Sequence, residues 1–158
     1  MISDNVFTNV IKQNHIKQGE NIMAAKQSER FIRGRKKLEE VIGGTGEGVV
    51  DSFAEVAPDL TRYIAEFPFG DIYTRPGLDV KYKQLAVISS LASQGDTALA
   101  LKVHINGALN VGWTPNEVIE TFLQLLPYAG WPKVQNAVAV AEQVFKDRGV
   151  APVWNDEN

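Results

Sequence analysis

The sequence contains no cysteine, which removes several kinds of chemistry at once. Without a thiol the chain can form no disulfide, no thiolate metal site and no cysteine nucleophile. No apolar run approaches the roughly 20 residues that a membrane-spanning helix needs. The first 22 residues are too polar to contain the apolar segment of a signal peptide. We therefore expect a cytoplasmic protein with no membrane partner.

An excess of basic charge is also lacking. The 158 residues include 16 Lys and Arg against 19 Asp and Glu, which gives a formal net charge of -3 at pH 7. A chain of this balance has no basic footprint for nucleic acid. Histidine occurs twice, at positions 15 and 104, so the carboxylates have few partners for a metal site. We expect neither a nucleic-acid partner nor a bound metal.

Hydrophobic residues make up 44% of the chain, which suffices for the core of one domain. They recur at helical spacing, and no two segments alternate as paired strands would. The pattern predicts an all-α fold of about six to seven helices. The expected helices are 28–41, 47–53, 59–67, 80–94, 98–110, 115–126 and 133–148.

Glycine, proline and capping residues mark the ends of these helices. The glycines of 43–46 indicate a C-cap and turn. The run 67–70, Phe-Pro-Phe-Gly, predicts a break. Asp79 is expected to cap the helix that follows, and Gly95 to end it. The clearest signal is Thr114-Pro115-Asn116-Glu117, a capping box with proline at the first helical position.

The helical pattern begins only after the first part of the chain. We expect residues 1–25 to be a flexible tail, 26–149 the folded domain and 150–158 a short acidic tail. The run Lys17 to Glu20 can be encoded by a purine-rich sequence resembling a ribosome-binding site, just before Met23. Translation starting at Met23 is therefore a hypothesis, which the mass of the native protein would test.

His104 is the first candidate for chemistry, because its unperturbed pKa lies near neutrality. It is expected on an inner face of small and apolar residues with Ala100, Leu101 and Ala108. There it can act as a proton donor, or it can be a core histidine bonded to a carbonyl. Arg75, next to a Pro-Gly turn, is either solvated or able to hold a carboxylate with its planar fork.

A polar stripe follows on the next helix. Glu120, Gln124 and Tyr128 recur every four residues, a spacing that places them on one face. Such a stripe is usually solvated, but here it can also face His104 across the turn at Gly112. Glu117 is assigned to the capping box and not to a site.

Several of these residues, in this order, resemble the carboxymuconolactone decarboxylase family over residues 30–148. The matching positions are Phe69-Gly70, Tyr73, Arg75-Pro76-Gly77-Leu78, His104, Gly107-Ala108-Leu109-Asn110, Gly112, Thr114, Glu117, Glu120, Gln124, Tyr128, Gly130 and Pro132. The resemblance implies the alkyl hydroperoxidase D-like helical fold. It also implies a homo-oligomer, either a hexamer built as a trimer of dimers or a trimer.

The resemblance implies one of two chemistries. One branch of the family uses a Cys-x-x-Cys pair, whose positions would fall near Thr97 and Ala100, so disulfide-based peroxidase chemistry is excluded here. The other branch decarboxylates 4-carboxymuconolactone in aromatic catabolism without metal or organic cofactor. On that reading His104 and Glu120 are catalytic, with Glu120 orienting His104 or relaying its proton. The residues expected to bind the small carboxylate substrate are Arg75, Lys83, Gln124 and Tyr128.

One part of the family pattern is changed. The resemblance implies an Arg-Glu pair where this chain has Lys83-Gln84, which removes one acid and one bidentate fork. The resemblance as a whole favours a cofactor-free lyase for a small carboxylated lactone or related oxo acid. The alternative, which the changes at Lys83 and Gln84 favour, is a non-catalytic small-molecule-binding or accessory oligomer on the same scaffold. A redox helper ranks last, because cysteine is absent.

Overall fold

A computed structural model of the chain describes residues 28–154, and this part holds seven α-helices, one π-helix and no strand. The elements are α2 (Glu29–Asp51), α3 (Pro58–Ile64), the π-helix η1 (Ala65–Ile72), α4 (Val80–Gln94), α5 (Ala98–Asn110), α6 (Pro115–Gln124), α7 (Leu126–Ala129) and α8 (Trp131–Arg148). The all-α prediction is confirmed. The expected N-terminal tail with Met23 and His15, and residues 155–158, lie outside the described residues.

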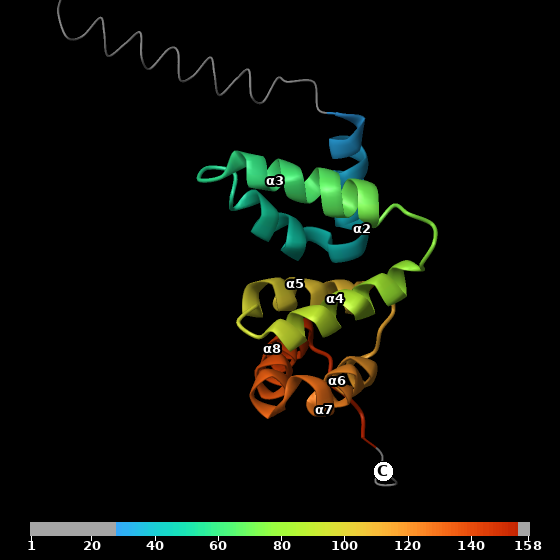
Figure 1. The fold of residues 1–158 in the computed structure, drawn as a ribbon, viewed down its shortest axis with the longest axis vertical. Coiled ribbons are helices and arrows are strands. Elements are labelled where there is room, and N and C mark those ends of the chain that lie inside the picture. Colours follow the sequence, from blue (N-terminus) through green and yellow to red (C-terminus); the bar gives the residue numbers. More distant parts are fainter. Residues whose placement is uncertain (1–27, 155–158) are drawn as a thin grey trace, which may run out of the picture.

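The helices form two layers, as Figure 1 shows. The upper layer in that view contains α2, α3 and η1, and the lower layer contains α4 to α8. Two apolar clusters correspond to them: one joins α4, α5, α6 and α8, and the other joins α2 and η1 to Val103 of α5. Because α5 contributes to both clusters, it is the helix that connects the layers. Among the helices of residues 28–154, none combines the length and the apolarity that crossing a bilayer requires.

The start and stop signals predicted from the sequence are confirmed for the lower layer. Asp79 accepts a hydrogen bond from the Lys81 N–H at the start of α4. Thr114 and Glu117 form the predicted capping box of α6, and a proline occupies the first turn. One predicted inner residue is wrong: Ala100 lies in the first turns of α5 and is exposed.

Of the two breaks predicted in the upper layer, the one at Gly43 is confirmed and the one at 67–70 is wrong. Gly43 has non-helical backbone angles (φ 68°, ψ -172°) and kinks α2, so one helical segment ends there and a second continues to Asp51. The run 67–70 does not break the chain, because it forms η1 with Pro68 inside. Phe69 of η1 is buried against α2, and this packing outweighs the local tendency of Pro68 to interrupt a helix.

Close backbone packing joins α2 to η1. A β-carbon at Gly34 would lie 1.8 Å from the Ala65 carbonyl oxygen, and one at Gly70 would lie 2.7 Å from the Arg30 carbonyl oxygen. Only glycine permits this approach. The two helices therefore touch backbone to backbone.

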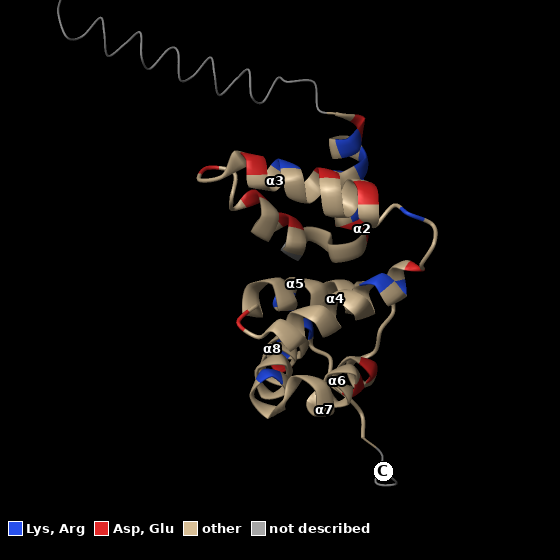
Figure 2. Cartoon of the chain, in the orientation of Figure 1, with Lys and Arg blue, Asp and Glu red and all other residues tan. Residues whose placement is uncertain are grey.

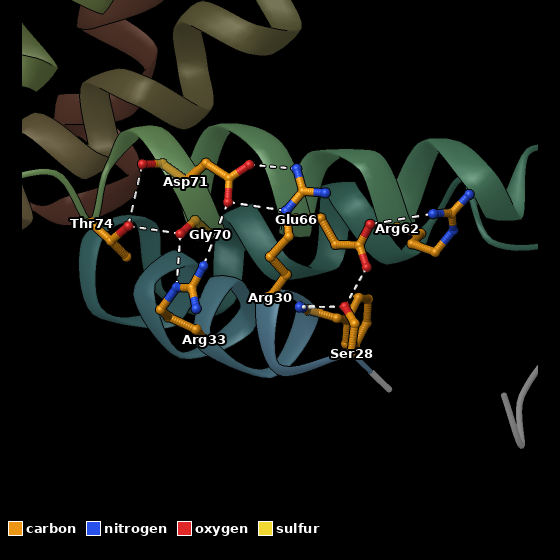
Figure 3. A network of polar contacts seen from close by, with 9 residues as sticks. Ser28, Arg30, Arg33, Arg62, Glu66, Gly70, Asp71 and Thr74 are labelled. Carbon is orange, nitrogen blue, oxygen red and sulfur yellow. Dashed lines mark hydrogen bonds and ion pairs between the residues drawn. The ribbon is translucent and has the colours of Figure 1, made fainter. Parts of the chain in front are cut away.

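Charged side chains border the same contact. Figure 2 marks basic positions along α2 and acidic positions on α3 and η1. Asp71 pairs with Arg30 and Arg33, and the Arg33 Nε also donates to the Gly70 carbonyl at 2.9 Å (Figure 3). Because the guanidinium groups are exposed, these pairs fix the orientation of the helices more than they stabilise the fold.

The glycine contact gives a test with a matched control on the same helix. Gly34→Ala should lower the free energy of unfolding by about 3 kcal/mol or more, because the new methyl group collides with the Ala65 carbonyl. Gly48→Ala should raise it by up to about 1 kcal/mol, because nothing lies within 4 Å of that β-carbon and alanine favours the helix. Urea unfolding of both variants measures the difference. Equal stability of the two would contradict the close packing of α2 and η1.

Candidate active site

His104 lies in the middle of α5, where it meets α4. Its Nδ1 is 3.0 Å from Oε1 of Gln84, and this is the hydrogen bond that holds the ring. Gln84 is in the second turn of α4 and is completely buried, with 0% exposure. The side chain that orients His104 within one chain is therefore Gln84, and not Glu120.

Burial lowers the pKa of His104 from 6.5 to about 4. Loss of hydration is the cause, since it disfavours the charged imidazolium. No carboxylate within residues 28–154 offsets this effect. His104 is therefore a neutral imidazole at pH 7, and a bound anion would favour its protonation.

The Gln84 amide is tightly enclosed. A β-carbon at Gly107 would lie 2.6 Å from Gln84 Nε2 and 3.3 Å from the Val41 carbonyl oxygen, so the glycine makes room for the amide. Gln84 Nε2 has no hydrogen-bond partner among the described residues. Asn110, one turn further along α5, donates to the same Val41 carbonyl at 3.3 Å.

Tyr73 is a second buried polar group of this region. Its ring stacks on Phe69 at a centroid distance of 4.9 Å, and its hydroxyl has no partner in the part of the chain that the structure describes. Burial raises the pKa of Tyr73 well above its usual value, so the phenol stays protonated. The sequence position was recognised in the family pattern, but its buried hydroxyl could not be foreseen.

Lys83 is occupied by the backbone. Its Nζ donates to the carbonyl of Tyr73 at 2.8 Å and also to the carbonyl of Arg75. These bonds tie the connection between η1 and α4 to the start of α4. Arg75 itself is exposed, and its guanidinium makes no hydrogen bond or ion pair with the residues described. Of the two cations expected to bind substrate, Lys83 is thus hydrogen-bonded to the backbone, and Arg75 has no partner among the described residues.

The polar stripe does not reach His104 in the single chain. Glu120 and Gln124 are exposed on α6, and Tyr128 on α7 is 81% exposed. Within residues 28–154, no hydrogen bond joins any of them to His104 or Arg75. The structure therefore brings Gln84 to His104, and it leaves the three residues of the stripe on an outer surface.

Metal ligation finds no support in the described part of the chain, where no group of three or more His, Asp or Glu is placed to hold an ion. A hollow of about 380 Å³ lies elsewhere, between α8 and the segment after it. Its lining includes Phe145, Pro152 and Trp154, and it does not include His104. The chemistry available at His104 is therefore proton transfer and hydrogen bonding.

Sequence reasoning identified Gln84 as a departure from the family pattern but not as the partner of His104. The available signal was spacing: position 84 is one turn into α4, and position 104 is on the antiparallel helix that follows. Two helices joined by a short turn pack against each other, so such positions can meet. Which of the α4 side chains meets the ring depends on packing that the sequence alone does not give.

Known proteins give the wider context. The family model for the carboxymuconolactone decarboxylase family matches residues 58–143. A 4-carboxymuconolactone decarboxylase of Acinetobacter baylyi is 31% identical over 125 residues, which are 78% of this chain and 92% of that protein. A nitrosuccinic acid decarboxylase of Metarhizium robertsii is 31% identical over 121 residues, 74% of this chain and 82% of that protein.

A third relative is an uncharacterised 15.0 kDa protein of Paracoccus denitrificans, 31% identical over 94 residues, 59% of this chain and 70% of that protein. The family match covers more than half of the chain, and it includes α4, α5 and the Gln84–His104 contact. The chain is a cysteine-free member of the carboxymuconolactone decarboxylase family.

Proposed function

We propose that the protein is a cofactor-free carboxy-lyase, which releases carbon dioxide from a small carboxylated lactone or a related acid with His104 handling the proton. The observation that carries the proposal is the neutral, partly buried imidazole held by Gln84 on the helix pair that the family match covers. Membership of a family with two named decarboxylases supports the reaction type.

The names of the two relatives suggest the chemical class of substrate. In carboxymuconolactone the carbon that loses the carboxylate is joined through the ring double bond to a lactone carbonyl, and in nitrosuccinic acid a carboxyl-bearing carbon also carries a nitro group. Each molecule can therefore accept the electron pair of the broken C–C bond itself. A substrate with such an acceptor needs no cofactor to delocalise the charge.

The remaining demands fall on the protein. It must hold the carboxylates, and it must deliver a proton to a carbon of the conjugated anion that remains. We assign the first task to Arg75, whose guanidinium is free to bind a carboxylate bidentately. Lys83 positions the Arg75 segment through its backbone bonds. His104 delivers the proton.

We further propose that the chain works as a homo-oligomer. Leu60, Tyr63 and Phe67 are exposed at helical spacing along α3 and η1. A second set of exposed apolar side chains lies close in sequence to the polar stripe: Leu123, Tyr128 and Trp131. Exposed apolar residues that gather into one patch are typical of a protein–protein interface. A neighbouring copy would give the polar stripe a buried environment, in which its residues can contact substrate.

Cytoplasmic location and a role in the breakdown of aromatic compounds are further parts of the proposed function.

A non-catalytic binding or accessory role on the same scaffold is the second candidate. Gln84 supports it, because glutamine cannot exchange a proton at the position where the family resemblance implies an acid. The engaged ammonium of Lys83 supports it as well. Release of carbon dioxide distinguishes the carboxy-lyase from the non-catalytic role.

The first test is carbon dioxide release by the purified protein from 4-carboxymuconolactone, nitrosuccinate and related lactone and oxo acids. His104→Ala should lower kcat by about 10²- to 10⁴-fold on any compound that reacts, which is the range for loss of a general acid or base. His15→Ala is the matched control and should leave the rate unchanged. Equal rates for the wild type and His104→Ala would remove His104 from the reaction. Binding without release would favour the accessory role.

Assembly provides a separate prediction. The wild type should run as an oligomer in light scattering coupled to size exclusion. Phe67→Glu should reduce the mass, because Phe67 is 60% exposed on the apolar stripe of α3 and η1 and a charge there cannot be buried. Val56→Glu, the same kind of change off the helical stripe, should not alter the mass. A wild-type monomer at micromolar concentration would contradict the oligomer.

A further inference from the structure

We propose that Gln84 is a positioning residue that fixes His104 with its proton on Nδ1 and its lone pair on Nε2. His104 then begins each turnover as a proton acceptor, and it becomes the donor only after taking up a proton with the substrate. This inference rests on the proposed decarboxylation and specifies where its proton comes from. It concerns a residue at which this chain departs from the family pattern.

The contact itself defines the tautomer. A neutral imidazole has one N–H and one lone pair, and a carbonyl oxygen can only accept. Because Oε1 of Gln84 lies 3.0 Å from Nδ1, the ring must donate from Nδ1. The proton is then absent from Nε2. That nitrogen is left as the acceptor.

The Gln84 amide has its oxygen toward the His104 ring and its nitrogen toward Gly107. Oε1 makes the one hydrogen bond of this amide among the described residues, and Nε2 has no partner there. A β-carbon at Gly107 would lie 2.6 Å from Nε2, so Gly107 is the residue that leaves room for the amide in this orientation. The side chain is completely buried, so the contact with His104 is the one that satisfies the amide oxygen.

Charged groups around the pair do not offset this arrangement. On α4, Lys83 is turned to the carbonyls that precede the helix. On α5, Lys102 pairs with Asp147 of α8 at 2.8 Å. From α2 the Val41 carbonyl lies beside Gly107, and Tyr73, which belongs to the same apolar cluster as Val103 of α5, stays neutral. Burial alone lowers the pKa of the imidazole to about 4, so the neutral form dominates at pH 7.

The reaction balances with one proton that moves twice. The carboxylic acid of the substrate gives its proton to Nε2, which leaves a carboxylate beside an imidazolium. The C–C bond then breaks, carbon dioxide leaves, and the electron pair passes into the carbonyl or nitro group of the substrate. Finally Nε2–H protonates a carbon of this conjugated anion and His104 is neutral again. The sum is conversion of R–COOH to R–H and carbon dioxide, with nothing oxidised or reduced by the protein.

The tautomer can be observed without any substrate. A His15→Gln background leaves His104 as the only histidine, and the ¹⁵N shifts of its ring at pH 7 report which nitrogen carries the proton. We expect a neutral ring with hydrogen on Nδ1. A ring protonated on Nε2, or an imidazolium at pH 7, would overturn the inference. This readout does not depend on activity, so it separates failure of the inference from failure of the proposed decarboxylation.

Activity gives a second readout with two variants of similar size. With ionised substrate, kcat/KM of the wild type should fall about tenfold for each pH unit above about 4, because the protonated form becomes scarce. In Gln84→Glu the carboxylate accepts from the imidazolium and raises the pKa of His104. The pH above which kcat/KM begins to fall should therefore move at least about one unit upward. The value of kcat/KM at pH 7 should rise about tenfold or more.

Gln84→Met keeps the bulk of the side chain but removes the acceptor. It should lower the rate and yield both ring tautomers in the ¹⁵N spectrum. A purely structural role for Gln84 predicts a different pattern, in which both variants lose activity equally at every pH and the pH above which kcat/KM begins to fall does not move. That pattern would overturn the inference.

Discussion

The absence of a β-carbon at Gly107 is the constraint on which the centre of the molecule depends. It lets the Gln84 amide of α4 lie against the α5 backbone and close to the Val41 carbonyl of α2, so three helices meet at one buried polar side chain. An amide in that position must satisfy its oxygen, and His104 is the group that does so. The same contact at Gly107 thus determines both how the layers pack and how His104 is oriented. A change that moves either helix also moves the ring.

Local signals in the sequence predicted the lower layer well. Asp79, Gly95 and the Thr114 capping box gave the bounds of α4 and the start of α6, because each satisfies backbone groups close by in the chain. The upper layer was predicted less well. The break at Gly43 was predicted from its glycines, but the run around Pro68 was interpreted as a second break, whereas it forms η1 and packs closely on the α2 backbone at Gly34 and Gly70. Such contacts are long-range, and local propensity does not report them.

The candidate site was also predicted only in part. The sequence identified His104, and the family resemblance identified Lys83-Gln84 as a changed pair, but neither could show that the changed residue holds the histidine. Arg75 and the stripe from Glu120 to Tyr128 lie on outer surfaces of the single chain. A site built from them depends on a neighbouring copy, which one sequence does not describe. The exposed apolar residues near the stripe are the physical reason to expect that copy.

Catalysis by His104 requires that its Nε2 face the carbon that takes up the proton. The most direct measurement is a crystal structure of the protein with an analogue of the reacting acid, in which the departing carboxylate is replaced by a carboxamide. We predict that the reacting carbon lies within about 3.5 Å of Nε2, the separation of a near-attack geometry. An analogue seated only in the hollow beside Trp154, with nothing at Nε2, would contradict the assignment of His104.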